Sequence, residues 1–151
     1  MRVNISFRNL EEVGADLLRL SHRLEKSSLE MKNNLALLIK DRIVLDMKES
    51  KGGRVYRRRN PNRTVQASAP GESPLYDLGS FAASIQVQKA SGPHQPARIG
   101  SNDFRADLFE FGGVDPGSNK YIEPRPWLWP NIERTAKDVR RIMDEAVRKA
   151  L

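Results

Sequence analysis

The 151-residue chain contains no cysteine, which excludes disulfide bonds, thiolate metal sites and cysteine nucleophiles. Its two histidines, His22 and His94, lie far apart in the sequence and offer little for a metal site or a catalytic triad. No apolar run approaches the roughly 20 residues that cross a bilayer, and the first residues lack the apolar stretch of a secretory signal. We therefore expect no cofactor, no metal and no membrane contact.

Positive charge is concentrated in one short stretch of the chain. The net charge is +7, and residues 50–66 hold six basic and no acidic side chains. The segment lacks the apolar side chains that would offset the entropy of ordering it. We therefore expect residues 51–76 to form a long, mobile basic loop without regular structure. Residues 54–63 contain one tyrosine and five arginines: Arg54, Tyr56, Arg57, Arg58, Arg59 and Arg63.

The N-terminal third predicts a short strand and then a long amphipathic helix. Val3, Ile5 and Phe7 alternate with polar residues, which is typical of a half-buried strand. From Leu10 to Lys48 apolar residues recur every three or four positions, as one long helix or as two. The residues Ser27-x-x-Glu30 match a capping box, which makes a kink or a restart plausible there.

The middle of the chain predicts short elements separated by turns. We expect a short helix over residues 78–84, with Asp77 as its cap and Leu78 on its packed side. Ile85 and Val87 predict a strand, and residues 97–100 predict its antiparallel partner. Residues 106–111 are too short for periodicity to choose between strand and helix, and residues 120–128 are expected to be extended because of their prolines.

The C-terminal segment predicts an amphipathic helix that begins near Pro130. Together these elements indicate an α+β fold in a single domain, residues 1–151, with a long N-terminal helix, a small mostly antiparallel sheet and a C-terminal helix. The apolar stripe of the last helix has three/four spacing and consists of Ile132, Ala136, Val139, Met143, Ala146 and Ala150.

Six short motifs occur in a fixed order along residues 50–130. They are Gly53-x-x-Tyr56 with its arginines, Ser68-Ala-Pro-Gly-Glu-x-Pro74, Leu78-Gly-x-Phe81 before Ser84-Ile85, Ile99-Gly-Ser101, Phe109-Glu-Phe-Gly112 and Arg125-Pro-Trp-Leu128. In this order the chain resembles the head–tail joining family of tailed bacteriophages, whose members are called neck, tail-completion or minor tail-component proteins. The resemblance implies a non-enzymatic virion protein that forms a ring subunit around the DNA channel at the head–tail junction.

The same resemblance implies the partners and the location. The partners would be further copies of the chain and other connector and tail proteins, with a non-specific contact to DNA in the lumen. The protein would be assembled in the bacterial host cytoplasm and reside in the neck or tail of the virion.

The basic segment admits three interpretations. Its arginines can face DNA phosphates, they can dock on an acidic patch of a neighbouring subunit, or the segment can be a solvated loop. The element Pro70-Gly71-Glu72-Ser73-Pro74 favours docking, because prolines reduce the entropy lost when a segment meets a partner. The alternative function is a nucleic-acid-binding protein without sequence preference. In that case five engaged arginines predict a log–log salt slope of about −4 to −5.

Aromatic and acidic residues near the C-terminal helix complete the candidates. Trp127 and Trp129 alternate in an extended segment, so we expect one in the core and the other exposed at an interface. Glu110 lies between two phenylalanines, where a carboxylate caps a helix or pairs with an arginine more often than it catalyses. No acidic cluster has the spacing of metal ligands, and the pattern predicts no enzyme.

Overall fold

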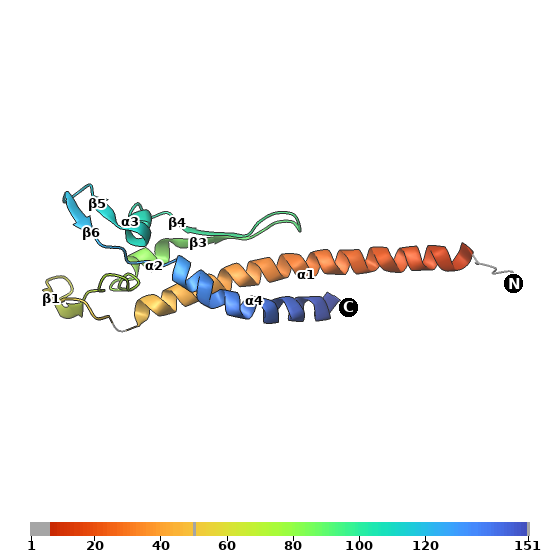
Figure 1. Ribbon diagram of the computed structural model, residues 1–151, viewed down its shortest axis with the longest axis horizontal. Coiled ribbons are helices and arrows are strands. Elements are labelled where there is room, and N and C mark those ends of the chain that lie inside the picture. The colour runs from red at the N-terminus through yellow and green to blue at the C-terminus, as the bar shows by residue number, and fades with distance from the viewer. Residues whose placement is uncertain (1–6, 50, 151) are drawn as a thin grey trace.

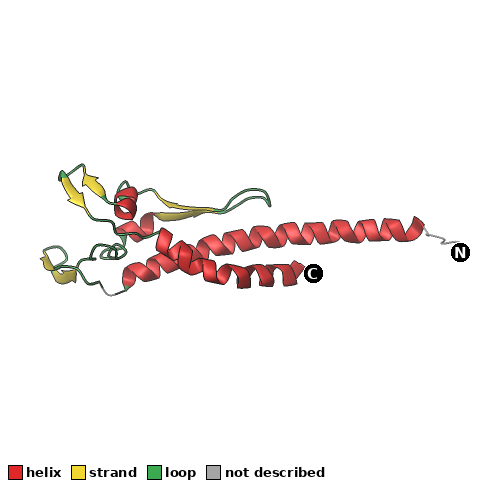
Figure 2. Cartoon of the chain, viewed as in Figure 1, coloured by secondary structure: helices red, strands yellow, loops and turns green. Residues whose placement is uncertain are grey.

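The computed structural model describes residues 7–49 and 51–150. The helix α1 (Phe7–Lys48) extends along the whole molecule, and α4 (Trp129–Ala150) lies antiparallel beside its C-terminal half (Figure 1). Short hairpins and two short helices gather around the same half of α1, as Figure 2 shows. The α+β class is confirmed. The predicted strand residues Val3 and Ile5 lie outside the described residues, and Phe7 belongs to α1.

The helix α1 is a single helix of 42 residues, about 60 Å long at about 1.5 Å per residue. It continues through Ser27, so the structure has no restart at the predicted capping box. The hydroxyl of Ser27 instead donates to the carbonyl of Ala146 in α4. Within the described part of α1, burial begins at Ser27 and is deepest near the C-terminal end, where Ile43 and Met47 are completely enclosed.

The predicted small sheet is three separate antiparallel hairpins. They are β1 (Val55–Arg58) with β2 (Arg63–Gln66), β3 (Ile85–Gln88) with β4 (Arg98–Ser101), and β5 (Gly113–Asp115) with β6 (Lys120–Ile122). The second hairpin confirms the strands expected at Ile85, Val87 and residues 97–100. Its far end is tied to α1, because the Asn33 side chain exchanges two hydrogen bonds with the backbone of Ala90.

Two short helices connect the hairpins. The helix α2 (Ser80–Ser84) begins two residues later than predicted, and Leu78 is exposed instead of packed. Its first cap position is Gly79, which has a left-handed backbone (φ 76°) and lies against the Tyr76 ring; Asp77 makes no cap. Residues 106–111 form the helix α3 (Ala106–Phe111), which resolves the ambiguity of that segment.

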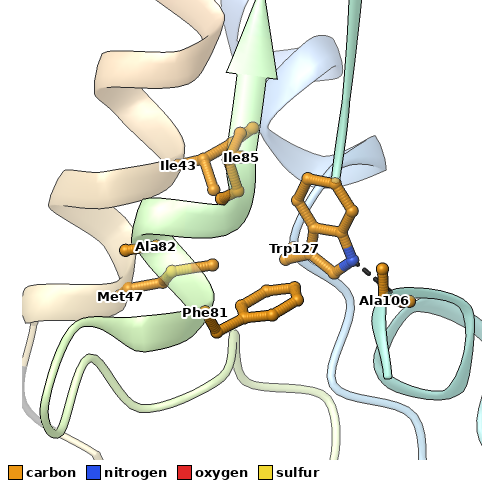
Figure 3. Packing of buried hydrophobic residues seen from close by; sticks show 7 residues of the cluster. All are labelled: Ile43, Met47, Phe81, Ala82, Ile85, Ala106 and Trp127. Atoms are coloured by element: carbon orange, nitrogen blue, oxygen red, sulfur yellow. Dashed lines mark hydrogen bonds between the residues drawn. The ribbon is translucent and has the colours of Figure 1, made fainter. Parts of the chain in front are cut away.

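The core lies where α1, α2, α3 and the segment before α4 meet (Figure 3). Phe81 is central, with the Phe109 ring edge-on at 5.0 Å and the Trp127 ring edge-on at 5.4 Å between centroids. The Trp127 indole N–H donates to the Ala106 carbonyl at 3.0 Å, so the polar end of the ring is satisfied inside the core. The buried cluster is Ile43, Met47, Phe81, Ala82, Ile85, Ala106 and Trp127.

Glu110 fixes the start of α4. Its carboxylate accepts hydrogen bonds from the backbone N–H groups of Trp127 at 2.8 Å, Leu128 at 2.9 Å and Trp129 at 3.0 Å. The first N–H groups of a helix have no partner within the helix, and a carboxylate also suits its positive end. The capping interpretation of Glu110 is therefore confirmed, with the cap coming from α3 and not from the helix itself.

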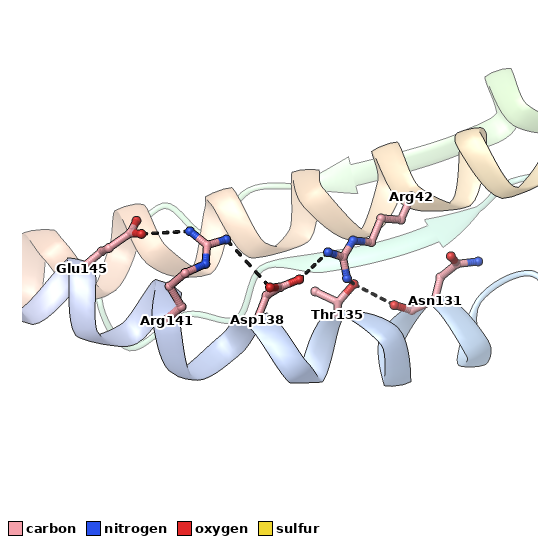
Figure 4. Close-up of polar contacts among 6 residues, drawn as sticks. All are labelled: Arg42, Asn131, Thr135, Asp138, Arg141 and Glu145. Atoms are coloured by element: carbon pink, nitrogen blue, oxygen red, sulfur yellow. Dashed lines mark hydrogen bonds and ion pairs between the residues drawn. The ribbon is translucent and has the colours of Figure 1, made fainter.

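The face of α4 that meets α1 is largely polar (Figure 4). Arg42 of α1 donates to the Thr135 hydroxyl at 3.2 Å and pairs with Asp138. Asn131 is buried and donates to the Asp46 carboxylate at 3.0 Å. The predicted helix is confirmed, but only part of its apolar stripe is packed: Ile132, Val139 and Ala146 are half-buried, whereas Met143 and Ala136 are exposed.

Candidate functional site: the basic hairpin and its supports

The basic segment is not structureless, so that part of the prediction is wrong. Residues 55–66, the basic hairpin, form β1, β2 and the turn between them. Backbone bonds between Gly53 and Ala67, and between Ala67 and Arg54, continue the pairing beyond the strands. A side chain at Gly53 would collide with the backbone of Ala67 and Ser68, so only glycine permits this approach. These strands could not be predicted from the sequence, because four-residue strands rich in arginine lack the alternation of apolar and polar residues that indicates a strand.

One face of the basic hairpin turns toward the body of the protein. Tyr56 lies opposite Val65, and Arg58 lies opposite Arg63. Val65 is buried, and both arginines form ion pairs with the same carboxylate, Asp77. Two of the five arginines are therefore neutralised within the chain and hold the hairpin in place.

The other arginines face away from this contact. Arg57 lies on the opposite face beside Thr64, and its guanidinium donates to the Asn62 side chain at 3.0 Å. Arg54 and Arg59 are exposed. Within the described ranges, none of these three forms an ion pair with an acidic side chain. They leave a small cationic surface available to an external anion.

The loop that follows the basic hairpin is bound to the protein by Glu72. Its carboxylate accepts hydrogen bonds from the backbone N–H of Gly52 at 3.0 Å and of Ala69 at 2.7 Å. These bonds lower the pKa of Glu72 below its ordinary value. Gly71 donates to the carbonyl of Pro124 at 2.8 Å, while Pro70 remains exposed. The motif Ser68–Pro74 thus works inside the chain as a clamp between distant segments.

A buried polar cluster ties the same loop to the end of α1. The Lys51 ammonium donates to the Asp46 carbonyl and to the Ser73 hydroxyl, both at 2.7 Å. Lys51 and Ser73 are buried, as is Pro74. Arg125 reaches the loop from the other side and donates twice to the Ser68 carbonyl, at 3.1 and 3.2 Å. Both ends of the basic hairpin are therefore fixed to the body.

A hollow of about 330 Å³ lies between the basic hairpin and the core. Its walls include Tyr56, Phe81 and three arginines. Each guanidinium already has a partner in the chain: Arg58 has Asp77, Arg105 has Asp103 in a two-point contact, and Arg125 has a backbone carbonyl. Because these charges are already engaged, the hollow shows no prepared anion site.

The two tryptophans separate as predicted. Trp127 is 3% exposed in the core, whereas Trp129 is 62% exposed at the start of α4, with its indole N–H bonded to Glu133 at 2.9 Å. Large apolar side chains are also exposed on the β5–β6 hairpin, where Val114 and Tyr121 lie opposite each other. Such surface is unusual for a protein that acts as an isolated monomer.

Further features of the described residues bear on chemistry. They contain no group of three or more His, Asp or Glu side chains placed to hold a metal ion. No helix in the described ranges is both long and apolar enough to cross a bilayer.

Comparisons of the chain with protein-family models, curated proteins and solved structures found no match.

Proposed function

We propose that the protein is a non-enzymatic structural subunit of a phage head–tail junction. Copies of it would form a ring that links the connector to the tail around the DNA channel. It would be assembled in the bacterial cytoplasm with other connector and tail proteins and would remain in the virion neck or tail.

The observation that carries this proposal is the large uncovered apolar surface of an extended chain. Among the described residues, fifteen large hydrophobic side chains are exposed, whereas ten hydrophobic residues are buried. They occur at both ends of the molecule, on α1 and on the hairpins at the other end (Figure 1). A subunit that contacts neighbours on several sides needs such surfaces. The order of sequence motifs supports the phage assignment.

Imaging of assemblies tests the proposal. The purified protein, alone and together with the products of the genes that flank its own, is examined by negative-stain microscopy. We expect rings with a central opening, or incorporation into connector or tail complexes. A protein that forms no ring and joins no complex with these products contradicts the proposal.

The free arginines of the basic hairpin favour one alternative function, binding of nucleic acid without sequence preference. Arg54, Arg57 and Arg59 have no acidic partner among the described residues, whereas Arg58 and Arg63 share Asp77. Three phosphate contacts predict a log–log salt slope of about −2.7, smaller than the slope for five. The same surface suits an acidic patch on a neighbouring subunit.

Substitutions on the hairpin separate these two partners. Alanine at Arg57 and Arg59 should abolish binding to double-stranded DNA of arbitrary sequence while the thermal midpoint stays unchanged. If DNA binding persists in this variant, the hairpin is not the DNA contact. If the original chain does not bind DNA and the variant loses assembly with other subunits, the hairpin contacts a neighbouring protein subunit.

A further inference from the structure

The N-terminal half of α1 has an apolar stripe that nothing in the described chain covers. Ser27 of α1 donates a hydrogen bond to Ala146 near the end of α4, and the N-terminal part of α1 projects beyond the end of α4 (Figure 1). Val13, Leu17 and Leu24 recur at three/four spacing with Leu20 and are exposed, Leu17 to 61%. A helix gains stability when its apolar face packs against another element, and the N-terminal half of α1 has no such element within the described chain. The stripe therefore indicates a partner.

A second uncovered stripe lies on α4. Its inner face makes polar contacts to Arg42 and Asp46 of α1, and part of its apolar surface stays outside this pairing. Ala136, Met143 and Val147 are exposed, and the last two are each 47% exposed.

We infer that the two stripes cover each other between copies of the chain: residues 13–24 of α1 pack against residues 136–147 of α4 from the next copy. Each stripe spans the same number of residues, about 17 Å of helix at about 1.5 Å per residue. Because different surfaces meet, each copy keeps one stripe for the next neighbour, and a repeated contact of this kind forms a ring when the rotation between successive copies closes. The inference rests on the proposed ring assembly and names its lateral contact.

Charge sets the antiparallel direction of this contact. The start of α1 is acidic, with Glu12 and Asp16 exposed on it and no basic residue between Arg8 and Arg19. The last ten residues of α4 carry three basic side chains and two acidic ones, and its last turn is basic, with Arg148 and Lys149. An antiparallel arrangement places the acidic start of one helix beside the basic end of the other, which also aligns the helix dipoles favourably. The same direction already occurs between α1 and α4 within one chain (Figure 1).

The absence of native cysteine makes cross-linking a direct test. Two variants, Leu17→Cys and Met143→Cys, are prepared separately, with different masses, and are mixed under mild oxidation. We expect the mixed disulfide dimer as the main product and a ladder of oligomers from the double variant. Dominant dimers of Leu17→Cys with itself would indicate a two-fold α1–α1 contact and overturn the inference. Absence of any mixed dimer would overturn it as well.

A matched pair of lysine substitutions gives an independent readout. Leu17 and Leu45 are both leucines of α1 with 61% exposure, but only Leu17 belongs to the stripe. Leu17→Lys should cause loss of assembly with an unchanged thermal midpoint, and Leu45→Lys should assemble like the original chain. If both variants form rings, the inferred contact is wrong while the proposed function stands. If the cysteine variants give the mixed disulfide but the original chain never enters a phage assembly, the contact stands and the proposed function fails.

Discussion

Removal of the Glu110 carboxylate should weaken the docking of α4 substantially, although Glu110 lies on the short helix α3. In Glu110→Ala the backbone N–H groups of Trp127, Leu128 and Trp129 lose their common acceptor. Trp127 is buried, so its backbone N–H cannot form a hydrogen bond to water in place of the lost one unless the core opens. The other two groups lie nearer the surface and can be rehydrated.

The magnitude follows from these three bonds. A single N-cap contributes about 0.5–2 kcal/mol, and a hydrogen bond to a charged group contributes about 1.5–3 kcal/mol. With one buried and two recoverable donors, we expect a loss of about 3 kcal/mol. For a chain of this size a change of 1 kcal/mol shifts the midpoint by roughly 2–4 °C, so the midpoint should fall by about 6–12 °C.

Thermal unfolding followed by circular dichroism at neutral pH measures this loss. Glu145→Ala serves as the control, because Glu145 forms an exposed pair with Arg141 at 2.9 Å, which is worth at most about 0.5 kcal/mol. Glu110→Gln keeps one acceptor oxygen and should fall between the two. A midpoint for Glu110→Ala within 2 °C or so of the control would refute the capping argument, since about 1 kcal/mol would then be its upper limit.

Three further predictions concern the core and the basic hairpin. Trp127→Ala should cost about 3–5 kcal/mol in chemical denaturation, whereas Trp129→Ala should change the stability of the monomer by less than about 0.5 kcal/mol; equal losses would contradict the assigned burial. The pKa of Glu72 is lower in the folded protein than its ordinary value of 4.5, so the ionised carboxylate stabilises the fold above pH 4.5 and this contribution is lost as the pH falls through the folded-state pKa. Glu72→Gln should therefore flatten the pH dependence of stability below about pH 4.5. Asp77→Asn should release the two arginines that it holds and steepen any salt dependence of DNA binding from a slope of about −2.7 toward −4.5; an unchanged slope would mean that these arginines stay out of reach of the phosphates.

The elements that the sequence predicted are those whose contacts are local or strongly periodic. Both long helices follow from three/four spacing, and the strand at Ile85 follows from alternation next to turn residues. The separation of Trp127 from Trp129 was predicted from alternation in an extended segment, and it occurs although Trp129 is the first residue of α4.

The features that sequence reasoning missed depend on contacts between distant residues. The basic hairpin needs Asp77, fourteen positions after Arg63, to pair with its arginines, and Glu72 to reach back to Gly52. The buried face of α4 was only partly predicted: Ile132, Val139 and Ala146 of the stripe are half-buried. Polar residues are buried there as well, because they bind Arg42 and Asp46, which lie about ninety positions away in the sequence. In both cases the packing depends on an acidic or basic side chain, and apolar periodicity alone could not predict it.

The anchoring of α1 has a mechanical consequence. The helix is fixed to the core at Ile43 and Met47, while roughly 30 Å of it, about twenty residues, precedes the hydrogen bond between Ser27 and Ala146 of α4. It therefore acts as a lever with a short arm in the core and a long arm outside. A tilt of about 10° at Ile43 would move the start of α1 at Phe7 by about 9 Å, because about 54 Å of helix separates them. Small repacking around Phe81 and Trp127 would then be amplified into large changes of spacing at the far end of the molecule.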